Sequence, residues 1–335
     1  MKIGHVDLDK DVLIIAEIGN NHEGSYALAE EMIGLAAQAG AGAVKFQTIV
    51  PNRLVSATQN ARVQQLERFR FSYKEFEKLS QVAQQENILF LSTPFDIESA
   101  RFLEPLVPAF KIASGDNNFF PLIEVIAGTG KPIIMSTGLM NLTEIVQSKD
   151  FIERIWHENG IQQELALLHC VVSYPTAPND ANLLAIKQLQ KLGVTVGYSD
   201  HTIGIEAAVL SVALGARIIE KHFTIAKDYS DFHDHRLSAD PQDMAQLVQR
   251  VKQALELLGN GEKSLPDCER KVISKVRRSI VASRDLAKGT VLTWDDITWV
   301  RPATGLAPGR EEEILGKTLI KAVERGEMIL PDDLT

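Results

Sequence analysis

Eight short apolar runs of strand length occupy the first two thirds of the chain. They lie at 12–16, 43–46, 88–91, 109–113, 132–135, 165–168, 194–197 and 216–219. Runs that are apolar on both faces and alternate with helical patterns indicate a parallel sheet that is buried on both sides. Eight such units within about 250 residues fit a closed barrel better than an open doubly wound sheet. We therefore expect an α/β fold, a (β/α)8 TIM barrel.

Helical patterns separate most of these runs. Ser25 is the expected N-cap of the first helix and Gly40 its end, because apolar residues recur at helical spacing between them. Similar patterns occupy 73–85, 142–157, 181–192, 205–214 and 241–258.

The character of the sequence changes after the last of these helices. A polar stretch at 259–275 predicts a linker, and short β-type runs follow at 279–282, 289–292 and 297–300 between Gly and Pro residues. We divide the chain into a barrel domain at 1–260, a linker at 261–276 and a small β-rich domain at 277–335. A domain as small as the last has a marginal core, so docking against another surface would help it.

The charge balance excludes some classes of partner. The 335 residues carry a formal net charge of -9 and no run of Lys or Arg, which argues against nucleic acid and against anionic membranes. The first residues lack the apolar core of a signal peptide, and no stretch stays apolar for about 18 residues, so we expect a cytoplasmic protein. Cys170 and Cys268 are too few for a disulfide framework, and we expect reduced thiols.

Polar residues follow the apolar runs, at the place where a barrel of this kind assembles its active site. In chain order they are Glu17, Lys45, Gln47, Ser92, Thr93, Ser114, Ser136, Thr137, His169, Ser199, Asp200, His201, Glu220, Lys221 and His222. A single polar strand tip carries little information, because every strand must surface somewhere. Polar tips on all eight runs favour a catalytic mouth.

His201 and His222 follow successive runs, so the barrel would bring them together. Neutral imidazoles suit a divalent cation such as Mn²⁺, Zn²⁺ or Fe²⁺, and a bound cation would polarise a carbonyl oxygen. The alternative is that each histidine only caps its strand by hydrogen bonding. The presence of both on adjacent strands favours the metal.

Lys45 and Lys111 sit between apolar residues at strand tips, where a cation needs an anionic partner. Each could bind a phosphate or a carboxylate together with Ser114, Ser136 and Ser199, or could form a structural salt bridge. Lys45 could instead form a Schiff base, as in aldolases.

The loop at 228–238 carries several carboxylates and histidines and would lie over the barrel mouth. We expect Asp234 to bind sugar hydroxyls. His233 and His235 could extend the metal site, or the loop could simply be solvated.

Motifs of three to nine residues run through the chain in a fixed order. They are AEIGNNHEG at 16–24, VKFQT at 44–48, STPFD at 92–96, FKIASG at 110–115, KPIIMSTG at 131–138, LLHC at 167–170, YPT at 174–176, GYSDHT at 197–202 and EKHFT at 220–224. Together they resemble the bacterial sialic acid (N-acetylneuraminate) synthases and their legionaminic and pseudaminic acid relatives. The tail, with RRSIVASRDL at 277–286 and VRP at 300–302, is similar to that family's antifreeze-like (SAF) domain.

The resemblance implies a metal-dependent transferase of nonulosonic acid biosynthesis. Such an enzyme joins C3 of phosphoenolpyruvate to the aldehyde of an unphosphorylated, open-chain N-acyl amino sugar and releases phosphate by C–O cleavage. The metal on His201 and His222 would be Mn²⁺, with Mg²⁺ or Co²⁺ as alternatives. The implied phosphoenolpyruvate ligands are Lys45, Lys111, Ser114, Ser136 and Ser199.

The resemblance also assigns the remaining site residues. Glu17 and Asp116 match acidic residues beside the reacting centre, and Tyr174 and Asp234 match sugar-contacting positions. Arg301 matches an arginine that the small domain of one subunit inserts over the barrel of the other. A domain-swapped homodimer is therefore implied.

Departures from the family pattern fall on the acceptor side. Asp116 stands where the family usually has a glutamate, and Val172 where a polar residue, often Asn, is usual. The loop before Asp234 lacks the usual GlyPro. These differences indicate an altered acceptor. Two rival interpretations stay open, a Schiff-base aldolase using Lys45 and a non-catalytic sugar-binding barrel.

Overall fold

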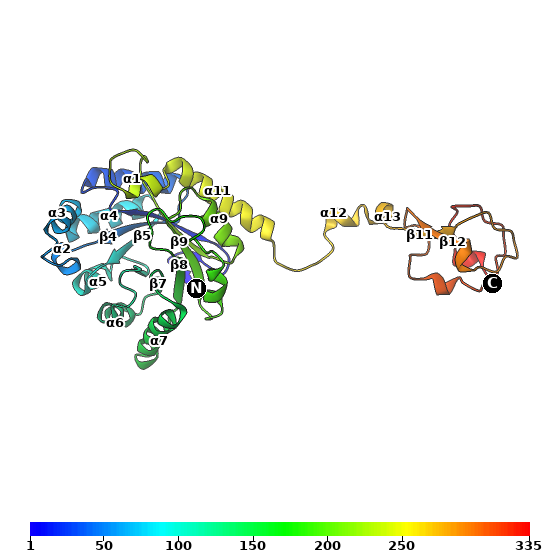
Figure 1. Ribbon diagram of the computed structural model, residues 1–335, viewed down its shortest axis with the longest axis horizontal. Coiled ribbons are helices and arrows are strands. Elements are labelled where there is room, and N and C mark those ends of the chain that lie inside the picture. The colour runs from blue at the N-terminus through cyan, green and yellow to red at the C-terminus, as the bar shows by residue number, and fades with distance from the viewer. The chain divides into compact units, whose positions relative to one another are not determined.

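The computed structural model describes residues 1–335 as two compact units, Met1–Gly259 and Asn260–Thr335. The first unit contains an eight-stranded parallel sheet, and Figure 1 shows helices around its strands. In chain order the strands are β3 (Leu13–Gly19), β4 (Ala43–Thr48), β5 (Leu89–Pro94), β6 (Phe110–Ile112), β7 (Ile133–Ser136), β8 (Leu165–Cys170), β9 (Thr195–Asp200) and β10 (Ile218–His222). The predicted TIM barrel is confirmed, and most strands extend further into the polar residues than expected.

The barrel closes by pairing its last strand with its first. β10 pairs with β3 in parallel, and this register places His222 opposite Glu17. The hydrogen-bonded order runs from β6 through β10 and β3 to β5. β5 and β6 pack side by side without a backbone ladder between them, so the barrel keeps one open seam.

Helices cover the outside of this barrel. Predicted helices appear as α1 (Tyr26–Gln38), α4 (Tyr73–Gln85), α7 (Leu142–Glu158), α9 (Glu206–Ala213) and α11 (Pro241–Leu258), whereas α8 (Ala185–Gln190) is shorter than predicted. Ser25 caps α1 by accepting from the backbone N–H of Leu28. The sequence did not predict α2 (Pro51–Leu54), α3 (Asn60–Phe69), α5 (Ile97–Leu103), α6 (Phe120–Gly128) or α10 (Asp234–Leu237). Most of these are short, and α6 lacks a clear polar face.

Strand side chains alternate between two buried layers. Ile14 and Ala16 belong to the outer core between strands and helices, whereas Leu13 and Ile15 belong to a second cluster inside the barrel. A short hairpin, β1 (Lys2–Ile3) with β2 (Val6–Asp7), contributes Ile3 to the inner cluster. The hairpin therefore closes the amino end of the barrel with apolar side chains.

One buried ion pair joins two strand ends on the outer face. Lys221 Nζ lies 2.9 Å from Asp200 Oδ2 and also donates to Thr202 O. Both charged side chains are almost fully buried, and Lys221 shares the outward parity of Ile219. Lys221 and Asp200 were expected in the mouth, and that expectation is wrong because side chains alternate along each strand.

The second unit has little regular structure. It contains α12 (Asp267–Arg270), α13 (Ile273–Val276) and an antiparallel pair, β11 (Ser279–Ala282) with β12 (Ile297–Val300). Ile280, Leu292 and Leu319 are part of its own small core. The expected strand at 289–292 is wrong, since only an isolated bridge from Val291 forms there. No helix in either unit combines the length and apolar character that crossing a membrane requires.

Replacing Lys221 by Met should destabilise the barrel by about 3–5 kcal/mol, because the Asp200 carboxylate stays buried without its cation. Urea denaturation followed by far-UV circular dichroism measures this loss. Lys74→Met, at an exposed position of α4, is the control and should change the free energy of unfolding by less than about 0.5 kcal/mol. Equal stability of the two variants would contradict the role given to the ion pair.

Candidate functional site at the barrel mouth

The side chains that point into the barrel change character along each strand. Near the amino ends they are apolar and include Leu13, Ile15, Ala43, Leu91, Ala109, Ile134, Ala166, Leu168 and Ile218. Two residues further along, the same face carries buried polar groups, namely Glu17, Lys45, Thr93, Lys111, Ser136, Cys170, Ser199 and Glu220. Because the period of a strand is two residues, these polar groups share the interior at the carboxyl ends.

Two lysines and two glutamates form the centre of the mouth. Lys45 Nζ lies 2.7 Å from Glu17 Oε2 and 3.8 Å from Glu220 Oε2. Lys111 Nζ lies 3.8 Å from Glu220 Oε1. Glu220 thus lies between both ammonium groups, although its strand pairs with neither of theirs. Opposite charges at these separations allow four ionisable groups to be buried together.

Each ammonium group also donates a hydrogen bond to one hydroxyl group. Lys111 Nζ donates to Ser136 Oγ at 2.7 Å, and Lys45 Nζ donates to Thr93 Oγ1 at 3.1 Å. Each ammonium group is therefore held in a fixed orientation, and both point into the same interior space.

Two further serines lie beside this cluster. Ser199 Oγ donates to Glu220 Oε1 at 3.1 Å. Ser114 Oγ accepts from the backbone N–H of Gly138 at 3.2 Å. A Cβ at Gly138 would lie only 2.7 Å from Ser114 Oγ and 2.7 Å from Val172 Cγ2, so glycine is required where these loops meet. The predicted lysines and serines therefore converge on the mouth.

Burial and mutual attraction set the ionisation of the central four groups. Burial lowers the pKa of Lys111, and Glu220 offsets this only in part. Burial also opposes the charge on Lys45, but Glu17 and Glu220 outweigh it and raise its pKa. Burial raises the pKa of Glu17, whereas the two lysines overcome burial at Glu220 and lower its pKa. Glu17 is thus the carboxylate that more readily takes up a proton.

His201 and His222 lie side by side, with ring centroids 5.4 Å apart. His201 Nδ1 lies 2.7 Å from Val171 O. Since a carbonyl only accepts, Nδ1 carries a hydrogen, and Nε2 is the ring nitrogen left to bind a cation. Burial opposes a positive charge on His201, but Cys170 and the Val171 carbonyl outweigh it and raise its pKa. His222 Nδ1 is buried without a hydrogen-bond partner. Burial, followed by the charges of His201 and Lys45, holds the pKa of His222 well below its usual value, so this imidazole is neutral.

Predicted sugar-binding residues border the histidine pair. The Tyr174 ring lies 4.2 Å from the His201 ring and 6.0 Å from the His222 ring, between centroids. Asp234, the first residue of α10, is buried, and its Oδ1 has no hydrogen-bond partner although His233 Nε2 lies 3.1 Å away. Tyr174 thus lies beside the histidines, and burial raises the pKa of Asp234 while His233 and His201 lower it in part.

Some predicted residues lie apart from the cluster. Asp116 follows β6 but makes no hydrogen bond or ion pair with the other site residues, and its Oδ2 is buried without a partner. Arg301 is exposed in the second unit. His169, expected at the mouth as a strand tip, instead bonds Ala181 O through Nε2 at 2.8 Å on the outer side.

Glu220 and Gln47 are the residues whose importance the sequence did not reveal. Both were placed at strand tips without a role. Gln47 Nε2 donates to Glu17 Oε1 at 3.1 Å, and Asn20 Nδ2 donates to Gln47 Oε1 at 2.9 Å. Counting in steps of two from an inward residue such as Ile218 would have found Glu220.

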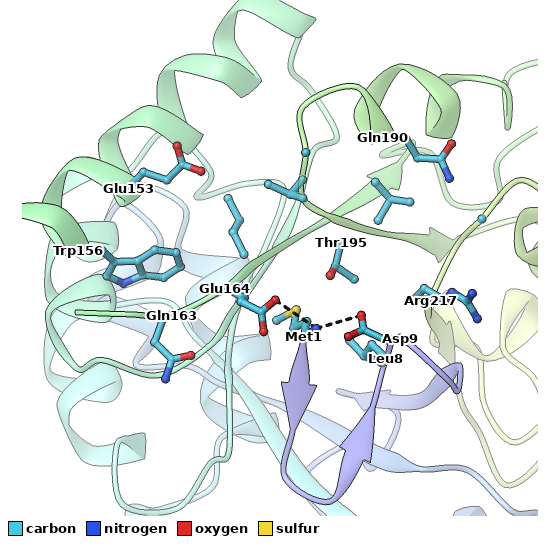
Figure 2. A pocket seen from close by; sticks show the side chains of 15 residues that line it. Met1, Leu8, Asp9, Glu153, Trp156, Gln163, Glu164, Gln190, Thr195 and Arg217 are labelled. Atoms are coloured by element: carbon cyan, nitrogen blue, oxygen red, sulfur yellow. Dashed lines mark hydrogen bonds and ion pairs between the residues drawn. The ribbon is translucent and has the colours of Figure 1, made fainter. Parts of the chain in front are cut away.

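A cavity of about 560 Å³ lies at the opposite, amino end of the barrel. Figure 2 shows Trp156 and Arg217 at its sides and the Met1 amine between Glu164 and Asp9. The amine lies 3.1 Å from Glu164 Oε1 and 3.3 Å from Asp9 Oδ1. No residue of the mouth lines this cavity, so the candidate site lies at the carboxyl end alone.

Comparison with known proteins identifies the family of this chain. The NeuB family profile matches residues 32–263, and the SAF domain profile matches residues 277–335. The chain belongs to the NeuB family. The resemblance inferred from the motifs is thereby confirmed, and this NeuB-family chain is an enzyme of a synthase family.

Relatives and a solved structure cover nearly the same length as this NeuB-family chain. It is 38% identical to the N,N'-diacetyllegionaminic acid synthase of Campylobacter jejuni, over 96% of the chain and 99% of the relative. It is 36% identical to a pseudaminic acid synthase of that species, over 99% of each. A crystal structure of an N-acetylneuraminic acid synthetase from Leptospira borgpetersenii, in complex with citrate, matches with a TM-score of 0.77 and 36% identity, covering 82% of this chain and 94% of that one.

The buried Asp116 predicts a pH-dependent stability. Burial raises the pKa of Asp116 from 3.8 to about 6, so around pH 5 the folded protein holds a proton that the unfolded chain has released. The folded state is therefore penalised above pH 6, and the penalty fades as the pH falls towards 4. At pH 7.5, Asp116→Asn should be more stable than the wild type by about 1–2 kcal/mol, allowing for partial solvent access.

Urea denaturation at pH 7.5 and pH 5 tests this sign. The advantage of Asp116→Asn should shrink at pH 5, and Asp180→Asn, at an exposed position, should show no such change. An advantage that grows on acidification would show that the carboxylate, not the acid, is the stabilised form.

Proposed function

We propose that this chain condenses phosphoenolpyruvate with an unphosphorylated N-acyl amino sugar in its open-chain aldehyde form. The product would be a nonulosonic acid, and phosphate would leave by C–O cleavage. The observation that carries the proposal is the mouth itself, where two directed lysines and the adjacent imidazoles of His201 and His222 face one space. The names of the relatives, which are synthases of diacetyllegionaminic and pseudaminic acid, support the same reaction class.

Lys45, Lys111, Ser114, Ser136 and Ser199 are proposed to bind the phosphate and carboxylate of phosphoenolpyruvate. Ammonium and hydroxyl groups are suitable donors for both anions. Glu220 favours the charged form of both lysines before the anion arrives, since it lies 3.8 Å from each ammonium group, although burial still lowers the pKa of Lys111. The site is therefore organised in advance of binding, which lowers the free energy of reorganisation.

His201 and His222 are proposed to hold a divalent metal, Mn²⁺ first, with Mg²⁺ or Co²⁺ as alternatives. Three features fit such an ion: His201 bonds through Nδ1 and leaves Nε2 for a metal, His222 Nδ1 is buried without a partner, and the two rings are adjacent. The pKa of His222 is lowered whereas that of His201 is raised, so metal binding would displace a proton from His201. No group of three or more His, Cys, Asp or Glu side chains converges there, so water and substrate oxygens would complete the shell. When bound, the metal would polarise the aldehyde oxygen as a Lewis acid.

The protein's own groups would then direct the bond changes. C3 of phosphoenolpyruvate bonds to the aldehyde carbon, whose oxygen takes up a proton, and water adds at C2. The C2–O bond to phosphate then breaks, which leaves the keto group of the product and releases inorganic phosphate. Glu17, whose pKa burial raises, is proposed to position the water and move its proton, with Gln47 orienting the carboxylate. Asp116 is the second acidic residue proposed beside this centre.

The acceptor is proposed to lie between Tyr174, Asp234 and Val172. Tyr174 and Asp234 offer hydrogen bonds beside the histidines. Val172, with 37% of its surface exposed, presents an apolar patch next to Ser114 and Gly138. Such a patch suits the methyl group of an acyl substituent better than a hydroxyl group. A diacetamido sugar is therefore tested first, with N-acetylmannosamine second.

The contacts of Lys45 weigh against the Schiff-base alternative. Its amine is 2.7 Å from Glu17, and the two carboxylates raise its pKa, so it stays protonated and cannot attack a carbonyl carbon. A binding-only barrel would have no use for a buried carboxylate such as Glu17 beside Lys45. Both rivals predict no release of phosphate from phosphoenolpyruvate.

Arg301 is proposed to complete the acceptor site of a second subunit in a domain-swapped homodimer. Its unit has a small core and matches the SAF domain. This assignment comes from the family resemblance and needs a test of its own.

The purified enzyme with Mn²⁺ should release phosphate from phosphoenolpyruvate in the presence of a suitable amino sugar and form a nine-carbon acid, detected by mass spectrometry. His222→Ala should lose metal retention and lower turnover by on the order of 10³-fold, because one of two protein ligands is gone. His157→Ala, an exposed position on α7, should leave both unchanged. A fully active His222→Ala would overturn the metal assignment, and no phosphate release with any hexosamine would overturn the proposed reaction.

Complementation between subunits tests Arg301. Arg301→Ala should mainly raise the KM for the sugar, and His222→Ala should be inactive. If the arginine acts across subunits, unfolding and refolding an equal mixture of the two variants should restore about a quarter of wild-type activity at limiting sugar, because one site of each heterodimer is intact. If heterodimers form but activity is not restored, Arg301 acts on the barrel of its own subunit or on neither barrel.

A further inference from the structure

The turn at 20–24, here called the Asn-His-Glu turn, makes contacts that the proposed reaction does not use. The His22 ring stacks on Phe71 with centroids 4.1 Å apart. Gly24 has a φ of 83°, and a Cβ there would lie 2.0 Å from Arg68 O. The turn is therefore pressed against the last turn of α3, and only glycine allows this approach.

Glu23 connects this turn to the loop after β10. Its Oε1 accepts from His235 Nε2 at 3.0 Å and from the Ser230 hydroxyl. His235 is fully buried, and its Nδ1 lies 2.7 Å from Thr224 Oγ1. Both ring nitrogens thus have protein partners, so His235 orders the loop and has no free nitrogen for a metal.

Asn21 makes a second connection to the same loop. Its Nδ2 donates to Phe223 O at 2.8 Å and to Ser238 Oγ at 2.9 Å. Ser238 Oγ in turn donates to Asp234 O at 2.6 Å. Asp234 is therefore bracketed, with His235 held by Glu23 on one side and Ser238 held by Asn21 on the other.

We propose that Glu23 and Asn21 are positioning residues for the acceptor, because they fix Asp234 over the mouth without touching substrate. The inference rests on the proposed function, in which Asp234 contacts the sugar. Glu23 adopts a φ of 48°, a left-handed conformation that few non-glycine residues take. This backbone conformation fits a side chain that must reach His235 from a fixed turn.

A purely stabilising role would give a different pattern of effects. Loss of a positioning contact should weaken binding of the sugar and leave phosphoenolpyruvate and metal binding intact, since Lys111, Ser136 and the histidine pair form no hydrogen bond with residues 226–238. General destabilisation would leave the KM values of the folded enzyme unchanged, or would raise them together.

The experiment compares Glu23→Ala, Glu23→Gln and Ser238→Ala with Glu31→Ala, an exposed carboxylate on α1 that serves as the control. Hydrogen exchange of the full chain, read by mass spectrometry, reports on residues 226–238. KM is measured for phosphoenolpyruvate and for the sugar, using N-acetylmannosamine and a 2,4-diacetamido hexose as probes. Mn²⁺ affinity is measured by electron paramagnetic resonance.

Glu23→Ala should speed exchange in 226–238 and raise the sugar KM, each by about tenfold, with the phosphoenolpyruvate KM and Mn²⁺ affinity within about twofold of wild type. Glu23→Gln should lie close to wild type, because its amide oxygen still accepts from His235. Ser238→Ala should act in the same direction as Glu23→Ala, and it tests the proposal even if Glu23→Ala does not fold.

An unchanged sugar KM in Glu23→Ala and Ser238→Ala, with an active wild type, would overturn the positioning role. A parallel rise of both KM values would overturn it as well. A wild type that releases no phosphate would instead refute the proposed function, and the exchange data would then show separately whether the turn orders the loop.

Discussion

Four buried charges at the centre of the mouth constrain the rest of the structure. Lys45, Lys111, Glu17 and Glu220 are each too costly to bury alone, and they can be buried only within a few ångströms of one another. That requires β3, β4, β6 and β10 to bring their ends to one place, which barrel closure through β10 and β3 achieves. Burial and the charge of His201 hold the pKa of the neighbouring His222 low, and Lys45 adds to this effect.

Much of this arrangement could be predicted because it depends on local periodicity. Apolar runs predicted all eight barrel strands, and polar residues at their ends predicted the mouth. The predictions were wrong where they did not distinguish the inward face of a strand from its outward face. Lys221 and His169 were grouped with the inward residues although each is one position out of phase with them, and a shift of one residue moves a side chain to the opposite face.

The contacts that the sequence did not predict depend on closure in three dimensions. Glu23 and His235 are 212 positions apart and meet only because β3 and β10 are neighbours. Glu220 reaches two lysines on strands that do not pair with its own. The strands of the amino-terminal hairpin have two residues each, too few for a periodic pattern to show.

The seam between β5 and β6 gives the buried ions a mechanical role. Lys45 and Lys111 stand on opposite sides of this seam, on β4 and β6, where the backbone ladder is interrupted. Glu220 lies between their ammonium groups and so links the two sides of the seam through ion pairs. An anion bound by both lysines would form a second link across the seam, in which ion pairs stand in for the missing backbone hydrogen bonds. Bound substrate would then help to hold the barrel together, so the barrel would become more rigid as the fraction of substrate-bound enzyme rises.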